Sequence, residues 1–117
     1  MRFLVCGGRK FNDYNRLEHI LNFYVGLPTD VIIHGGAQGA DYLAGVWASV
    51  HGVPVEVYPA EWDKYGKSAG YIRNAKMLKE GRPHIVIAFP GGKGTKMMVE
   101  LAKKAGVQII NLDTESN

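Results

Sequence analysis

The sequence predicts an α/β domain in which a parallel five-stranded sheet, with the strand order 3-2-1-4-5, carries helices on both faces. The first observation is that short runs of branched apolar residues alternate strictly with longer amphipathic stretches, which is typical of doubly wound domains. The second is the length of 117 residues, which corresponds to a single domain. The third is that right-handed crossovers between parallel strands leave few strand orders.

Five apolar runs are the expected strands, at residues 3–6, 31–33, 53–57, 85–89 and 107–110. The first, second and fourth are almost continuously apolar, as in a parallel sheet that is covered on both faces. Four glycines before the later strands are expected to end the helices, because glycine readily adopts the left-handed conformation found there. These glycines are Gly26, Gly52, Gly81 and Gly106.

Four amphipathic stretches are the expected helices, because their apolar residues recur every three or four positions. Asp13, Ser68 and Thr95 are the expected N-caps, since their side-chain oxygens can accept from free backbone amides. We expect the folded domain to span residues 1–113 and residues 114–117 to form a tail. The apolar positions are Tyr14, Leu17, Leu21 and Tyr24 in the first stretch, Leu43, Trp47 and Val50 in the second, Ile72, Ala75 and Leu78 in the third, and Met97, Met98, Leu101, Ala102 and Ala105 in the fourth.

Composition and charge exclude several classes of protein. No apolar run approaches the ~18 residues that span a membrane, and the first residues lack the pattern of a signal peptide, so we expect a cytoplasmic protein with no membrane partner. The single cysteine rules out an internal disulfide, and the four histidines lack metal-ligand spacing. We therefore expect no metal and no cofactor. The net charge of +3 favours anionic partners such as phosphates but is too small to argue for nucleic acid.

A second group of glycines follows three expected strands directly, at residues 7–8, 35–39 and 91–94. The carboxyl ends of parallel strands meet at one edge of the sheet, where α/β domains hold their ligands. Glycines let backbone amides approach an anion, and a helix N-terminus adds partial positive charge. We therefore expect a phosphorylated ligand to contact the amides of residues 35–39 and 91–95. The structural alternative is three tight turns with no ligand.

Two familiar phosphate-binding motifs are absent. Gly66-Lys67-Ser68 resembles the end of a P-loop, but Glu61 stands where that motif needs its first glycine. The dinucleotide fingerprint is missing after the first strand, and the second strand ends in His34 rather than in a ribose-binding acid. Both observations argue against a nucleoside triphosphatase and against a standard NAD dehydrogenase.

Four sequence blocks stand in order along the chain: Gly7-Gly8-Arg9-x-Phe11-x-Asp13, His34-Gly35-Gly36-Ala37-x-Gly39-Ala40-Asp41, Trp62-x-x-Tyr65-Gly66-Lys67-x-Ala69-Gly70-x-x-Arg73-Asn74-x-x-Met77 and Pro90-Gly91-Gly92-x-Gly94-Thr95. Together they resemble the SLOG superfamily, and in particular a small bacterial and phage subgroup. The superfamily includes the LOG cytokinin-activating phosphoribohydrolases and the DNA-processing protein DprA. The resemblance implies a Rossmann-like fold and a nucleotide or nucleotide-derived ligand, ADP-ribose relatives included.

The resemblance to the LOG hydrolases breaks at their catalytic glutamate, whose position falls on Met98. Arg73 matches the arginine that accompanies this glutamate. Glu100 lies two residues further on, and at ~100° per residue it points almost to the opposite side of the helix. Cleavage of an N-glycosidic bond needs an acid near the anomeric carbon. Asp41, Glu61 and Asp63 are the remaining sources, so the resemblance supports binding better than catalysis.

The candidate site residues lie at the expected crevice or in the loop before the third helix. Arg9 and Arg73 can grip a phosphate, and Trp62 and Tyr65 can stack on a base. Asp41 can hold ribose hydroxyls, act as an acid, or only complement a helix dipole. The catalytic candidates are Asp41, Arg73 and Glu100. The candidate ligand-binding residues are Gly7, Gly8, Arg9, Gly35, Gly36, Ala37, Gly39, Asp41, Trp62, Lys67, Arg73, Asn74, Pro90, Gly91, Gly92, Gly94 and Thr95.

Three functions remain open. The first is a sensor or sequestering protein for a nucleotide-derived phosphorylated small molecule, and the second is an N-glycosidic hydrolase or transferase of nucleotides. DNA binding, by resemblance to DprA, ranks last because the small net charge implies no long basic groove. Cys6 is expected to be an inert core thiol. Apolar helix residues such as Tyr71, Met97, Met98 and Trp47 predict a homodimer or a higher even assembly.

Overall fold

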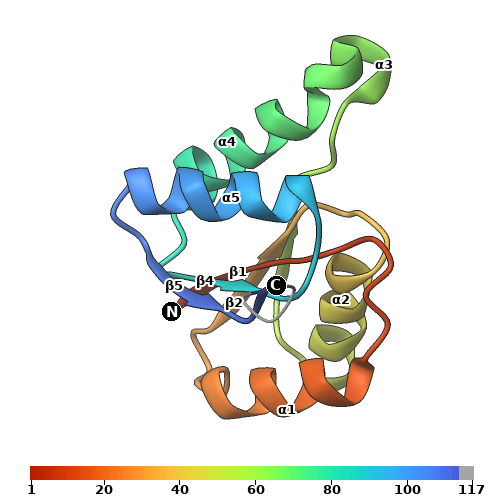
Figure 1. Ribbon diagram of the computed structural model, residues 1–117. Coiled ribbons are helices and arrows are strands. Elements are labelled where there is room, and N and C mark those ends of the chain that lie inside the picture. The colour runs from red at the N-terminus through yellow and green to blue at the C-terminus, as the bar shows by residue number, and fades with distance from the viewer. Residues whose placement is uncertain (114–117) are drawn as a thin grey trace.

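The computed structural model describes residues 1–113, so the tail expected at residues 114–117 lies outside the described residues. Its strands pair in parallel in the order β3-β2-β1-β4-β5 (Figure 1), which confirms the predicted fold class and strand order. The elements are β1 (Arg2–Cys6), α1 (Tyr14–Tyr24), β2 (Val31–His34), α2 (Ala40–His51), β3 (Val55–Val57), α3 (Trp62–Tyr65), a 3-10 turn (Gly66–Ser68), α4 (Ala69–Gly81), β4 (Ile85–Ala88), α5 (Lys93–Lys104) and β5 (Gln108–Asn111).

The strand register brings the glycine loops together. Leu4 in β1 pairs with Ile33 in β2, and Cys6 pairs with Ala88 in β4. Because β1 is the central strand and all its neighbours are parallel to it, the loops that follow β1, β2 and β4 share one edge of the sheet.

Each face of the sheet is covered by two helices, because successive strand residues point to opposite faces. Phe3 and Val5 pack against α1 and α2, whereas Leu4 and Cys6 pack against α4 and α5. Figure 1 shows α1 and α2 on one side of the sheet and α4 and α5 on the other, so the prediction of helices on both faces is confirmed. Within residues 1–113, no helix has the length and apolar character needed to cross a membrane.

Two residues that we expected on an assembly surface lie in the core instead. Trp47 is 1% exposed, and its indole nitrogen donates to Asn22 Oδ1 at 2.9 Å, while Met98 is fully buried. Tyr71 remains open to solvent and Met97 is half-buried. The helices therefore expose less apolar surface than their stripes suggest. The homodimer stays a prediction, which light scattering of the purified protein tests.

Two of the four glycines expected to end helices do so in the left-handed conformation, Gly52 with a φ of 68° and Gly106 with a φ of 73°. α1 ends before Gly26, in an extended residue. α4 includes Gly81, and the following Arg82 takes the left-handed φ of 48°. A Cβ atom at Gly81 would lie 3.4 Å from Ile33 of β2, which is an ordinary van der Waals contact, so packing does not require a glycine there.

Of the expected N-caps, only Asp13 is confirmed, since its carboxylate accepts from the backbone amide of Arg16 at 3.1 Å. Ser68 precedes α4 without making a side-chain cap bond. Thr95 is not a cap, because α5 begins at Lys93 and places Thr95 inside the first turn. α5 therefore starts without any side-chain acceptor for its first amides.

Candidate ligand-binding site

A cavity of about 590 Å³ opens at the sheet edge where β1, β2 and β4 end. It is bounded by the loop after β1, the start of α2, the segment from α3 into α4, and the start of α5. Its volume lies in the range of small-molecule sites. The candidate residues that line it are Gly7, Gly8, Arg9, Ala37, Asp41, Trp62, Lys67, Arg73, Asn74, Gly92, Gly94 and Thr95.

Some of the glycines serve to pack the three loops against one another. The Gly8 amide donates to the Pro90 carbonyl at 2.9 Å, and the Gly8 carbonyl accepts from the Ala40 amide at 3.2 Å. Gly39 has a φ of 79°, and a Cβ atom there would collide with the Gly8 carbonyl oxygen. A Cβ atom at Gly91 would lie 2.6 Å from the Gly8 amide nitrogen. Gly39, Pro90 and Gly91 therefore hold the loops together, and none of them lines the cavity.

The loop between β2 and α2 has three amides that are satisfied by neighbouring side chains. Asp41 Oδ2 accepts from the amides of Gly35 at 3.0 Å and Ala37 at 3.2 Å, and His34 Nδ1 accepts from the amide of Gly36 at 3.0 Å. Asp41 and His34 are both buried. In this arrangement the three amides are taken by the protein itself and are not available to a phosphate.

Burial governs the protonation of these two acceptors. It raises the pKa of the Asp41 carboxyl, although the bonds from the Ala37 and Gly35 amides and the charge of Arg73 lower it. Burial also lowers the pKa of His34. Because His34 Nδ1 accepts a hydrogen bond, the neutral ring carries its proton on Nε2.

The loop between β4 and α5 leaves its amides free. Gly91 donates to Asp113 Oδ1 at 2.7 Å, and Asp113 is buried. The next four amides, of residues 92–95, donate to no group in the described part of the chain. The Thr95 hydroxyl also has no partner there, although Thr95 is only 4% exposed and lines the cavity. An anion at this helix N-terminus would satisfy several donors at once.

Gly92 and Gly94 have no steric need to be glycines. A Cβ atom at either position would meet nothing within 4 Å, and neither residue has a positive φ. Both line the cavity. They therefore differ from Gly39 and Gly91, and they leave the first amides of α5 open to a ligand.

Arg73 and Asn74 connect α4 to both glycine loops. Arg73 Nη1 donates to the Gly35 carbonyl at 2.6 Å, and Arg73 Nε donates to Asn74 Oδ1 at 2.9 Å. Asn74 is buried, and its side-chain nitrogen lies 3.5 Å from the Gly94 carbonyl. These bonds fix the guanidinium while Arg73 Nη2 donates to no group among residues 1–113, so Nη2 is a free donor at the cavity.

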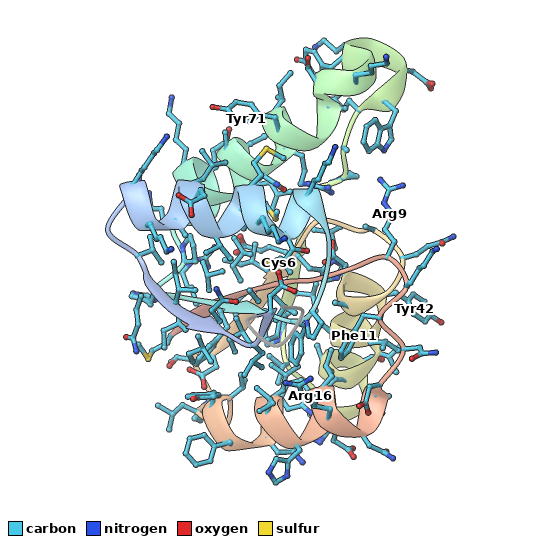
Figure 2. All side chains as sticks on the ribbon, in the orientation of Figure 1. Cys6, Arg9, Phe11, Arg16, Tyr42 and Tyr71 are labelled. Atoms are coloured by element: carbon cyan, nitrogen blue, oxygen red, sulfur yellow. The ribbon has the colours of Figure 1, made fainter. Side chains whose placement is uncertain are left out.

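The rim of the cavity carries the remaining positive charge. The guanidinium carbon of Arg9 lies 5.4 Å from the centre of the Trp62 ring, within the range of a cation–π contact. Figure 2 shows Arg9 projecting from the loop after β1 toward the end of the molecule where α3 lies. Lys67, in the turn between α3 and α4, also lines the cavity. Because Arg9 and Trp62 come from opposite sides of the opening, their contact bridges it.

The acidic candidates differ in whether their side chains line the cavity. Asp41 lines the cavity, whereas Glu61, Asp63 and Glu100 do not. The Glu100 side chain is 64% exposed and lies 3.6 Å from Lys103, so it is turned away as the helix geometry predicts. Met98 is fully buried and lines the cavity. The position that resembles the LOG glutamate therefore faces the site without an ionisable group.

Sequence reasoning missed part of the cavity wall, namely Cys6, Gly70, Tyr71, Met77 and Met97. One signal could have found Met77, since it stands four residues after Arg73 and so shares its helix face. Cys6 lies on the face of the sheet that α5 covers (Figure 2). Burial raises the pKa of its thiol, which keeps it protonated and agrees with an unreactive core residue.

Comparisons with known proteins give two matches. The profile of the YspA, cpYpsA-related SLOG family, designated YAcAr, matches residues 1–65. That segment holds the first two glycine loops, and the loop before α5 lies beyond it. The chain is also similar to the "Gene 61 protein" of Mycobacterium phage D29, at 40% identity over 69% of this chain and 70% of the phage protein. No solved structure matches the chain.

Proposed function

Because this chain belongs to the YspA, cpYpsA-related SLOG family, we propose that it binds a nucleotide-derived phosphorylated small molecule at the carboxyl edge of its sheet. The phosphate sits at the N-terminus of α5, and the sugar and base occupy the rest of the cavity. In this role the protein senses or sequesters its ligand.

The observation that carries this proposal is the set of four free amides at residues 92–95 beside the cavity. The unpartnered Thr95 hydroxyl and the free Nη2 of Arg73 add two donors on the same cavity wall. Lys67 adds a positive charge. Hydrogen bonds to a charged acceptor are stronger than those between neutral groups, and a phosphate offers enough acceptor oxygens for several of them.

Binding without rapid cleavage is the expected behaviour. Met98 stands at the cavity where the LOG hydrolases carry their acid, and it can neither donate a proton nor stabilise an oxocarbenium-like centre. Asp41 is the remaining acid at the cavity, but its Oδ2 already holds two backbone amides. We expect the rate of base release from a nucleoside monophosphate to be at least about a hundredfold below an ordinary enzymatic rate.

Calorimetry with AMP, ADP and adenosine tests the phosphate site. We expect both nucleotides to bind and adenosine not to bind. Gly92→Val should weaken nucleotide binding roughly tenfold or more, because the methyl groups of the valine would cover free amides. Each hydrogen bond from such an amide to the phosphate contributes more than about 1.4 kcal/mol, which corresponds to tenfold in affinity. Gly26→Val is the matched control, since a Cβ atom there also meets nothing within 4 Å and Gly26 lies at the opposite edge of the sheet.

Equal effects of the two valine substitutions, or equal binding of adenosine and AMP, would refute the phosphate site. The hydrolase alternative has its own test, in which free base is measured by chromatography after incubation with AMP. Turnover at about one per second would show that the protein is an enzyme and that its acid is not at position 98. Asp41 would then be the first residue to replace.

A further inference from the structure

A polar side chain occupies the buried stripe of α4. Asn74, Met77 and Gly81 recur at helical spacing and are all buried. Met77 belongs to the core cluster that also contains Met98 of α5. A buried amide costs free energy unless its hydrogen bonds are satisfied, so an apolar residue would be the ordinary choice at position 74. Asn74 therefore needs partners, and both of them belong to the candidate site.

The Asn74 amide joins a guanidinium to the first turn of α5. Its Oδ1 accepts from Arg73 Nε at 2.9 Å, and its Nδ2 makes a long hydrogen bond of 3.5 Å to the Gly94 carbonyl. Gly94 lies in the helix turn that carries the free amides. The other end of the guanidinium is held by the Gly35 carbonyl, which accepts from Nη1 at 2.6 Å. The guanidinium is thus fixed at two nitrogens, and Nη2 remains for a ligand.

Both groups that hold Arg73 are uncharged. Among residues 1–113, no carboxylate forms an ion pair with it. Burial lowers the pKa of Arg73, the charge of Asp41 partly raises it, and the charge of Arg9 lowers it further. An aspartate at position 74 could accept the same bond, but it would neutralise the guanidinium. The amide of Asn74 instead orients Arg73 and leaves its charge to attract an anion.

We propose that Asn74 is a positioning residue for the anion site. It holds the Arg73 guanidinium beside the first turn of α5, so that Nη2 and the free amides of residues 92–95 contact the same phosphate. A side chain that is fixed in advance loses less conformational entropy when the ligand binds. The inference rests on the proposed function and deepens it, because it explains how groups from two helices form one site. Since Asn74 also lines the cavity, its action through Arg73 must be distinguished from direct contact with the ligand.

A double-mutant cycle on AMP binding makes this distinction, measured by calorimetry on the full chain. We expect Arg73→Ala to weaken AMP binding at least about tenfold, and Asn74→Ala at least about fivefold, because the guanidinium is then no longer held in place. If Asn74 acts through Arg73, the double variant should bind AMP within about twofold of Arg73→Ala alone. A direct contact with AMP would instead make the two losses multiply.

Asn22→Ala is the matched control. Asn22 Oδ1 also accepts one side-chain hydrogen bond, from the Trp47 indole nitrogen at 2.9 Å. Asn22 lines a hollow that shares no residue with the main cavity, so its replacement should leave AMP binding unchanged. If Asn74→Ala does not fold by circular dichroism, Asn74→Leu takes its place in the cycle, because leucine fills a similar volume without an acceptor.

Asn74→Asp supplies a readout that a purely structural role would not move. It keeps an acceptor for Arg73 Nε, but we expect it to weaken AMP binding at least about tenfold, because the carboxylate neutralises Arg73 and repels the phosphate. Wild-type affinity in Asn74→Asp or in the folded apolar variant would overturn the inference, and so would losses that multiply. Each of these results leaves the proposed function standing. If the wild-type protein does not bind AMP, the proposed function falls together with the inference.

Discussion

The two glycine loops that open onto the cavity look alike in sequence but differ in what their amides do. The loop between β2 and α2 is closed at its start, since Asp41 and His34 accept the amides of residues 35–37. The loop between β4 and α5 is open, since the amides of residues 92–95 have no acceptor within residues 1–113. The amides of residues 35–37 in the closed loop are therefore bonded within the protein, whereas the amides of residues 92–95 in the open loop are available as donors to a ligand.

The difference shows that a glycine-rich loop at a strand end has two separate uses. Gly39 is needed because a side chain would strike the neighbouring loop, whereas Gly94 is surrounded by open space and borders the cavity. The same residue type thus supports folding in one loop and ligand access in the other. Four experiments test this distinction, in order of the size of the expected effect.

Replacing the packing glycine should have the largest effect. In Gly39→Ala the new Cβ atom would overlap the Gly8 carbonyl oxygen, at a residue whose φ is 79°. We expect the free energy of unfolding to fall by about 3 kcal/mol or more, because strain and overpacking add. Urea denaturation measures it. A decrease in the free energy of unfolding below about 1 kcal/mol would mean that the two loops can move apart to make room for the added methyl group.

Removing the internal acceptor of the closed loop should come next. Asp41→Ala leaves the buried amide of Gly35 and the partly buried amide of Ala37 without acceptors, which costs about 2 kcal/mol or more. Asp41→Asn keeps an acceptor oxygen and should cost less than about 1 kcal/mol. Denaturation of both variants provides the comparison. Equal losses for the two would show that the carboxylate charge, and not the hydrogen bonds, holds the loop.

The open loop should respond in the opposite direction. Gly94→Ala adds a methyl group in a helix where nothing lies within 4 Å, so we expect the free energy of unfolding to rise by about 0.5–1 kcal/mol. The same methyl group should weaken ADP binding about fivefold, which corresponds to the loss of one hydrogen bond. A variant that is more stable and binds ADP unchanged would remove the distinction between the loops.

The smallest effect is a pH dependence in the closed loop. Burial lowers the pKa of His34 below the ~6.5 of an unfolded histidine. As pH falls below that value, the unfolded chain takes up a proton that the folded chain does not, so stability falls. Above about pH 6.5 this contribution is fully present. His34→Gln keeps an acceptor for Gly36 without titrating.

Urea denaturation at pH 7.5 and pH 5.5 therefore should show a smaller loss on acidification for His34→Gln than for the wild-type protein. Asp41 acts in the opposite sense, because its pKa is raised by burial and its protonation favours the folded state. It is unchanged in both proteins, so the difference between them isolates His34. Identical pH profiles would mean that His34 does not hold the loop.

The fold could be predicted from sequence because its signals are local. Alternating apolar runs and amphipathic stretches, with right-handed crossovers, lead to the observed strand order. Helix ends were predicted less well, since Gly81 lies inside α4 and the following Arg82 takes the left-handed conformation. A glycine near the end of a helical stretch does not by itself show which residue adopts the left-handed conformation.

The sequence predicted the sheet edge at which the cavity opens, whereas the candidate site residues remain a prediction. Glycine loops at strand ends pointed to the correct sheet edge for the cavity. Whether a glycine such as Gly39 or Gly94 serves loop packing or ligand access depends on which atoms lie next to it, and only the packed structure determines this. Asp113 illustrates the same limit, because it accepts the Gly91 amide across 22 residues of sequence. Nothing in the residues around Asp113 marks it as a support for the site.

The stacking of Arg9 on Trp62 also gives the protein an optical property. Its two tryptophans lie in contrasting surroundings, with Trp47 1% exposed in the core and Trp62 47% exposed at the rim. Indole emission shifts to shorter wavelength when the ring leaves water, so the signal from Trp47 is a constant background. The signal from Trp62 changes if a base displaces water or the guanidinium from its ring. Fluorescence can therefore follow occupancy of the opening without any attached dye.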